Sequence, residues 1–165
     1  MIINSTQNGS RIALLKEKNL TEFHHDNDEN KFKVGDIYLG TVKKIVPGLN
    51  AAFIDIGYEK DAFLHYLDLG PQIRSLNKYT KKALSNKHTS GSLANFKNEP
   101  DINKLGKMNQ VLTKGQQILV QIVKEPISTK GPRLTCELSL AGRYMVLVPF
   151  SNSINISKKI TDGEE

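Results

Sequence analysis

The hydrophobic and polar positions of the chain predict a mainly β protein. Between Ile37 and Leu138, five short segments are typical of β-strands. The first three alternate in the period of two that a β-strand imposes on its faces, and the fourth is largely apolar from Ile118 to Val123. These segments are residues 35–48, 51–57, 61–66, 116–126 and 133–140. A long interruption separates the third from the fourth. Five short strands so arranged are typical of the OB-fold, and we predict a five-stranded antiparallel OB-fold barrel.

The second and third segments place two aromatic rings on the same side of the predicted sheet. Successive side chains of a strand point to opposite faces, so Phe53 lies opposite Ala52, and Phe63 lies opposite Leu64. The small and aliphatic residues suit the core. We therefore expect Phe53 and Phe63 to lie outside the barrel, with His65 on the same face.

An outer aromatic pair on these two strands predicts a surface for unpaired bases. OB-folds bind oligonucleotides on their second and third strands, and base stacking contributes about 1–3 kcal/mol per ring. Lys124, at the end of the fourth segment, and Lys130, on the following turn, are cations suited to phosphates, and His65 could stack or donate a hydrogen bond. The alternative is that the insert or another domain covers this face and that the rings are ordinary packing.

The insert between the third and fourth strands, residues 71–114, carries all of the excess positive charge. It contains nine Lys and Arg residues against Glu99 and Asp101, whereas acidic residues outnumber basic ones by one in the remainder. This asymmetry favours a polyanionic partner, and a solvated polar loop is the other interpretation. Apolar residues three or four apart predict a short helix from Asp101 to Leu112.

The sequence shows no catalytic or metal-binding constellation, so we assign it no catalytic residue and no metal ligand. Cys136 is the lone cysteine and is expected to be a buried thiol, and His24, His25 and His88 stand in polar segments. No glycine loop has the spacing of a nucleotide-binding motif. No apolar run has the length that spans a bilayer, so we expect a cytoplasmic binding protein without membrane association.

Several segments resemble the ribonuclease E/G family of bacterial endoribonucleases. They read "IYLGTVKKIVPGLNAAFIDIGYEKDAFLHYLDL", "GQQILVQIVKEPISTKGPRLTCELSLAGRYMVLVP" and "ISKKI", and the opening "IINSTQNGSRIALL" is similar as well. The motifs "PGLNAAFIDIG", "KDAFLH" and "EPISTKGPRLT" follow one another with the spacing of the family. The resemblance covers nearly the whole chain, and the exception is the insert from Ile73 to Asn98.

This resemblance implies a domain organisation that the composition does not show. In the family, an OB-fold RNA-binding domain of ribosomal-protein type is inserted into a ribonuclease H-like fold. Residues 1–31 are then the amino-terminal strands of the host fold, and residues 32–139 are the OB-fold domain with its insert. Residues 140–165 are the return strand and tail of the host fold.

The resemblance also implies a function, the clamping of single-stranded RNA in a magnesium-dependent endoribonuclease of RNA processing and decay. Phe53 and Phe63 match the two RNA-contacting phenylalanines of the family, and Lys130 matches its basic turn residue, whereas His65 and Lys124 rest on their shared surface. The aspartates for Mg²⁺ are expected beyond Glu165, so the segment is expected to bind RNA without cutting it. The full-length protein could be a homo-oligomer.

Two alternatives remain open at the level of the sequence. One is a free-standing OB-fold RNA-binding protein of translation or transcription that has no nuclease activity. The other is a protein-docking surface in which the aromatic side chains anchor an interface.

Overall fold

The computed structural model describes residues 1–6, 9–27, 32–85, 93 and 95–157. In this part of the chain, most of the strands belong to an amino-terminal sheet or to a barrel. The sheet contains β1 (Ile2–Thr6), β2 (Gly9–Lys16) and β3 (Asn19–Asn27), in the order β1-β2-β3. The barrel contains β4 (Ile37–Val46), β5 (Ala51–Asp55), β6 (Ala62–His65), β7 (Gln117–Lys124) and β8 (Arg133–Thr135). A short ribbon follows, formed by β9 (Leu140–Ala141) and β10 (Val146–Leu147).

The barrel closes in the strand order β4-β5-β6-β8-β7, with β7 pairing back to β4, which makes it OB-fold-like. Four of the neighbouring pairs are antiparallel, whereas β6 and β8 run parallel. The prediction of an entirely antiparallel barrel is therefore wrong in this pair. The reason is geometric, because strand directions that alternate around a ring of five cannot alternate at the closing position.

The barrel interior is filled by the residues that the period of two predicts. Ala52, Ile54, Ala62 and Leu64 are completely buried, and they alternate with the outward-facing residues of β5 and β6. A fully buried side chain of the size of Ile54 or Leu64 contributes about 1.5–3 kcal/mol. Gly40 allows β4 to bend across this core, because a β-carbon there would lie 2.6 Å from Cγ2 of Ile54.

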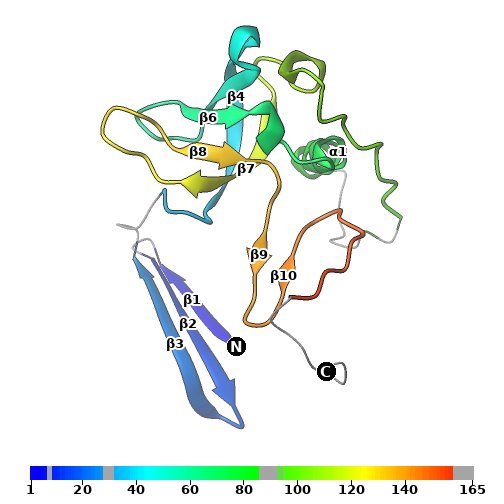
Figure 1. Cartoon of the computed structure of the whole chain (residues 1–165). Coiled ribbons are helices and arrows are strands. Elements are labelled where there is room, and N and C mark those ends of the chain that lie inside the picture. The colour runs from blue at the N-terminus through cyan, green and yellow to red at the C-terminus, as the bar shows by residue number, and fades with distance from the viewer. Residues whose placement is uncertain (7–8, 28–31, 86–92, 94, 158–165) are drawn as a thin grey trace.

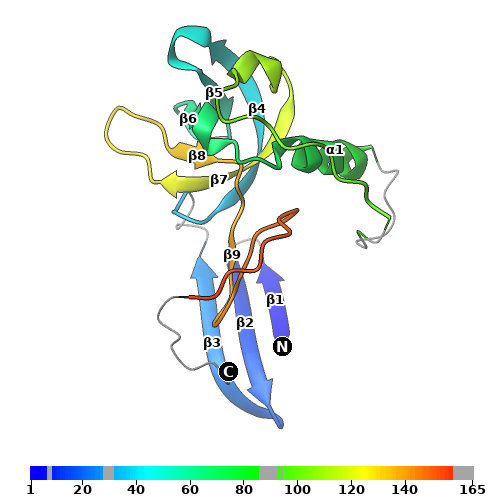
Figure 2. The same ribbon diagram turned by 45° about the vertical axis from the view of Figure 1, so that its right-hand side comes forward.

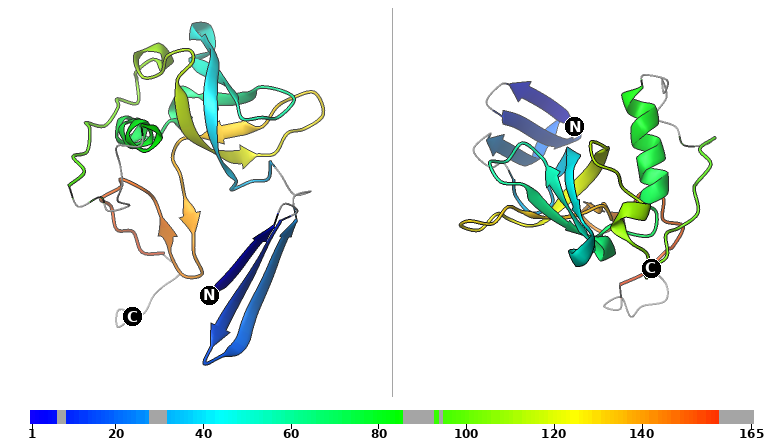
Figure 3. Two further views of the ribbon diagram at one scale, coloured as in Figure 1. Left: turned by 180° about the vertical axis from the view of Figure 1, so that it is seen from behind. Right: turned by 90° about the horizontal axis from the view of Figure 1, so that it is seen from above.

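The insert contains a helix that the sequence pattern did not reveal. α1 runs from Ile73 to Leu84 and buries Ile73 and Leu76 at the end of the barrel, together with polar side chains. One of these, Thr80, donates from Oγ1 to the carbonyl of Leu76 at 2.9 Å. The buried positions follow helical spacing, but several of them are polar, which hides the pattern. α1 lies on the side of the barrel opposite the β7–β8 turn (Figures 1 and 3).

The helix predicted from Asp101 to Leu112 is wrong. Its regular structure is one 3₁₀ turn, η4 (Met108–Gln110), and Leu105 is 92% exposed. Met108 and Leu112 are buried in the barrel core, and Ile102 packs against it. Their spacing thus reflects an irregular segment that touches the core at intervals, rather than one face of a helix.

The β1–β3 sheet and the β9–β10 ribbon lie at the same end of the barrel (Figures 1 and 2). The sheet exposes large apolar side chains, among them Ile2, Ile3, Leu20 and Phe23. The predicted boundary near residue 31 follows β3, and residues 28–31 lie outside the described part of the chain. No helix of the described residues has the length and apolar character needed to cross a membrane.

Candidate nucleic-acid interface

Phe53 and Phe63 form an aromatic pair on the outer surface of the barrel. They are direct partners across β5 and β6, and their ring centroids are 5.9 Å apart in an edge-to-face arrangement at 69°. Both rings are half-buried, whereas the residues before and after each of them are buried in the core. The strand register therefore presents two adjoining rings to the exterior.

The two rings line an open groove of about 640 Å³. The groove lies between the β5–β6 connection and the β7–β8 turn, and both contribute charged side chains. Its walls are formed by Phe53, Lys60, Asp61, Phe63, Lys124, Glu125, Ile127, Thr129, Lys130, Gly131 and Arg133. Four cations against two carboxylates make the surroundings of the rings electropositive. No described residue of the insert lines this groove, so the described part of the insert does not cover the rings there.

The β7–β8 turn is held in place over the groove by backbone contacts. Ile127 and Lys130 exchange two hydrogen bonds, of 3.1 and 2.9 Å, which close a two-residue turn. Lys60 donates from Nζ to the carbonyl of Ser128 at 3.1 Å. Phe63 donates its backbone N–H to the carbonyl of Pro132 at 2.8 Å. These bonds fix the turn that carries Lys130 relative to the aromatic pair.

Of the five residues that the sequence predicts to contact RNA, four line the groove. Phe53, Phe63, Lys124 and Lys130 line the groove together, and both lysines are exposed. His65 does not line it. Its Nδ1 accepts the backbone N–H of Leu67 at 3.2 Å and so caps the 3₁₀ turn η3 (Tyr66–Asp68).

Arg133 is a groove residue that the sequence analysis missed. The parallel β6–β8 pairing sets Arg133 opposite Phe63, and the antiparallel β7–β8 pairing sets it opposite Lys124. On the other side of the aromatic pair, β4 sets Lys44 opposite Phe53. Alternation in "RLTCEL" indicates that Arg133 points outward, but only the closure of the barrel brings it beside Phe63.

Asp61 in the groove wall and the nearby Asp55 are both paired with Lys43. Lys43 lies 2.8 Å from Asp61 and 3.4 Å from Asp55, and hydrogen bonds to these carboxylates raise the lysine's pKa. The backbone N–H of Gly57 and the charge of Lys43 lower the pKa of Asp55. In the described part of the chain, no three His, Cys, Asp or Glu side chains are grouped as metal ligands would be.

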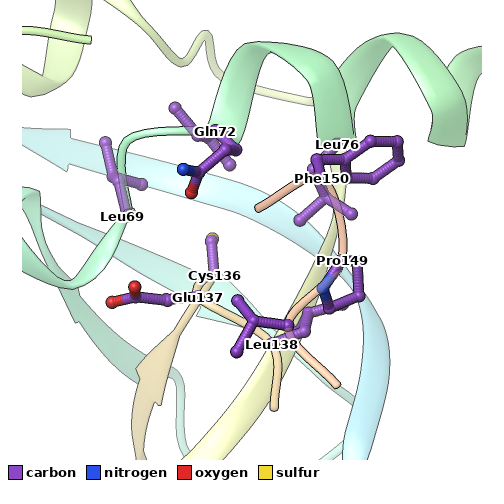
Figure 4. A pocket seen from close by; sticks show the side chains of 11 residues that line it. Leu69, Gln72, Leu76, Cys136, Glu137, Leu138, Pro149 and Phe150 are labelled. Carbon is purple, nitrogen blue, oxygen red and sulfur yellow. The ribbon is translucent and has the colours of Figure 1, made fainter. Parts of the chain in front are cut away.

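A second hollow lies between α1 and the chain that leaves the barrel (Figure 4). It measures about 10 Å³, which is the room that one water molecule needs. Cys136 lines it from the barrel side, and burial raises the pKa of its thiol well above the ordinary value. This hollow is a packing junction with no room for a ligand, and Cys136 is the buried thiol that the sequence predicts.

The chain is similar to curated proteins named ribonuclease G or ribonuclease E/G-like. Ribonuclease G of Haemophilus influenzae is 34% identical over all 165 residues, and ribonuclease G of Escherichia coli is 32% identical over the same length. A ribonuclease E/G-like protein of Porphyra purpurea is 44% identical over 135 residues, or 81% of this chain. The chain spans 30% of the two ribonuclease G sequences and 21% of the third. No family model matches it.

The fold, the groove and the similar proteins together identify the family of the chain. The structure defines an OB-fold-like barrel with a cation-lined aromatic groove. The two ribonuclease G sequences align with the chain from end to end, including the barrel and its flanks. The chain belongs to the ribonuclease E/G family.

Proposed function

We propose that this chain binds single-stranded RNA and serves as the substrate clamp of a magnesium-dependent endoribonuclease of RNA processing and decay. The observation that carries the proposal is the Phe53–Phe63 pair within a cation-lined groove, on a segment homologous to ribonuclease G. A base stacked on a ring contributes about 1–3 kcal/mol whatever its identity, because every base has a π-face. The groove would therefore hold unpaired RNA with little base preference.

The roles of the groove residues follow from their chemistry. Phe53 and Phe63 would stack adjoining bases, since the two rings adjoin one another and both line the groove. Lys124 and Lys130 would attract phosphates as exposed point charges. His65 would act at the margin, because its Nδ1 already accepts the backbone N–H of Leu67.

The remaining features of the proposal concern the whole protein. We infer that the β1–β3 sheet and residues 140–165 belong to a ribonuclease H-like host fold that carries the barrel, since the sheet exposes apolar residues such as Ile3 and Phe23. The bond-cleaving residues and Mg²⁺ would be supplied from outside this segment. A cytoplasmic location and a homo-oligomer are part of the same proposal.

The test is the binding of a single-stranded RNA to Phe53→Ala and Phe63→Ala variants in the presence of EDTA. We expect each variant to remain folded and to lose about 1–3 kcal/mol of binding free energy. Tyr144→Ala is a matched control, because it removes an exposed aromatic side chain that does not line the groove. Unchanged affinity in a folded double variant would rule out the stacking surface.

A gel assay of the same RNA with and without magnesium distinguishes clamping from cutting. The full-length protein is expected to cleave the RNA when magnesium is present, and residues 1–165 alone are expected to retain it intact. Binding without cleavage by the full-length protein would instead support an RNA-binding protein that lacks nuclease activity. Preference for a protein ligand over RNA would identify the face as a docking surface.

A further inference from the structure

We propose that Arg133, oriented by Asp68, is a phosphate-binding fork for the nucleotide whose base stacks on Phe63. This inference rests on the proposed RNA binding and deepens it, because it adds a second mode of phosphate contact to the single charges of the lysines. The observations that carry it are the ion pair between Arg133 and Asp68, the fixed backbone of Asp68, and the register of β6, β7 and β8.

The guanidinium of Arg133 is held by one edge. Nε and Nη2 both donate to Oδ2 of Asp68, at 3.1 and 2.9 Å. A guanidinium is planar and carries five N–H donors, so the edge formed by Nη1 and the second hydrogen of Nη2 is still available for an anion. The Arg133 side chain is 44% exposed, against 23% for Asp68, which leaves the arginine as the more accessible partner.

Asp68 is itself anchored by the strand that carries Arg133. Its carbonyl accepts the backbone N–H of Cys136 at 2.8 Å and the hydroxyl of Thr135 at 2.8 Å. These bonds fix the 3₁₀ turn η3 against the end of β8. The carboxylate therefore approaches Arg133 from a fixed backbone, and the arginine loses less conformational entropy when it binds a ligand.

The register places this fork next to a stacking ring. Arg133 is the partner of Phe63 on β6 and of Lys124 on β7, so one neighbour is aromatic and the other is cationic. Paired strands lie about 4.8 Å apart, which puts the arginine within reach of the backbone of a nucleotide stacked on Phe63. Lys124 and Lys130 line the same groove, and this concentration of charge favours a phosphate over an uncharged base edge.

An arginine fork binds a phosphate with a geometry that a lysine cannot provide. A phosphate offers two oxygens that match two parallel N–H donors, which an ammonium group cannot reproduce. Arg133→Lys retains the charge and the ion pair with Asp68, but it loses the second donor edge. Asp68→Asn removes a negative charge near the site, so electrostatics alone predicts tighter RNA binding, whereas loss of the orienting partner predicts weaker binding.

The experiment measures the affinity of the full-length protein for oligouridylate and oligoadenylate in EDTA, across a series of salt concentrations. We expect Arg133→Ala to weaken binding about tenfold for both oligomers and to lower the salt slope by about 0.7. We expect Arg133→Lys to retain the melting temperature and the salt slope while it still loses affinity. Asp68→Asn should lower affinity by about two- to fivefold.

Lys114→Ala serves as the control, because it removes an exposed cation that does not line the groove. Wild-type affinity in a folded Arg133→Ala variant would overturn the proposal, as would tighter binding by Asp68→Asn. A loss confined to one of the two oligomers would instead assign Arg133 to base recognition. Phe63→Ala and the Phe53→Ala/Phe63→Ala double variant are measured in parallel. If they weaken binding and Arg133→Ala does not, the fork is wrong and the stacking surface stands. If the folded double variant binds as the wild type does, the proposed function itself fails.

Discussion

Gly131 lies against the backbone of Asp61 so closely that a β-carbon at position 131 would overlap the Asp61 carbonyl oxygen. The contact joins the β7–β8 turn to the β5–β6 connection, and Lys60 reinforces it through its bond to Ser128. Each of these two segments forms one wall of the groove. The distance between the stacking rings and Lys130 is thus set by a backbone contact that only glycine allows.

Gly131→Ala is predicted to displace the β7–β8 turn and to weaken RNA binding while the barrel stays folded. The added methyl group meets backbone atoms that cannot rotate away, and overpacking of this kind costs about 1–3 kcal/mol. Melting temperature and RNA affinity are the two measurements. Gly48→Ala is the control, because no atom lies within 4 Å of a β-carbon built there. Equal affinities in the two variants would contradict the prediction.

Ile73→Ala is predicted to lower the free energy of unfolding by about 2–4 kcal/mol. The insert helix α1 buries Ile73 to 1% exposure in the barrel core, so removal of its side chain leaves a cavity there. Leu84→Ala, in the last turn of the same helix, is the control, because Leu84 is 48% exposed. Urea denaturation compares the two variants. Similar losses would show that α1 is not part of the core.

Gln121→Leu is predicted to destabilise the protein by about 2–4 kcal/mol, because several polar groups lose their partners. The buried amide of Gln121 donates to the carbonyls of Gly35 and Ser139, each at 2.9 Å, and accepts the backbone N–H of Ser139 at 2.8 Å. It thereby joins the chain entering the barrel to the chain leaving it. Gln117→Leu, on the exposed face of β7, is expected to change the unfolding free energy little. Equal changes in the free energy of unfolding for the two substitutions would refute the stabilising role of the Gln121 amide.

Asp55→Asn is predicted to reduce the acid sensitivity of the fold. The Gly57 N–H and Lys43 lower the pKa of Asp55 in the folded protein. The ionised Asp55 carboxylate therefore stabilises the fold fully at any pH above the pKa that Asp55 has in the unfolded chain. That contribution is lost as the pH falls through the folded pKa, below about pH 4. The melting temperatures of variant and wild type should differ at neutral pH and converge in acid. A difference in melting temperature that stays the same across the pH range would show that the ionisation of Asp55 does not stabilise the fold.

The core of the fold could be predicted from the sequence because it follows local rules. Alternation placed Ala52, Ile54 and Leu64 inside the barrel, and the structure buries all three. The same rule placed Phe53 and Phe63 on the opposite face, where they line the groove. Helical spacing was less reliable in the insert, since Met108 and Leu112 contact the core from an irregular segment.

The candidate site was only partly predictable, because its residues come together through the closing of the barrel. Lys124 and Lys130 were expected near the rings from their place at the end of a strand and on a turn. His65 was expected there too, but its ring caps the next 3₁₀ turn. Arg133 was missed because no local pattern shows that β8 runs parallel to β6.

The sequence by itself determined which residues face the core, where the strands lie and which family the chain resembles, since each depends on neighbouring residues or on an ordered set of motifs. The tertiary structure decided which outward-facing side chains meet. Phe63 and Arg133 are seventy positions apart in the chain and become neighbours only through the pairing of β6 with β8. Such a pairing depends on the closure of the whole barrel, which no short stretch of sequence specifies.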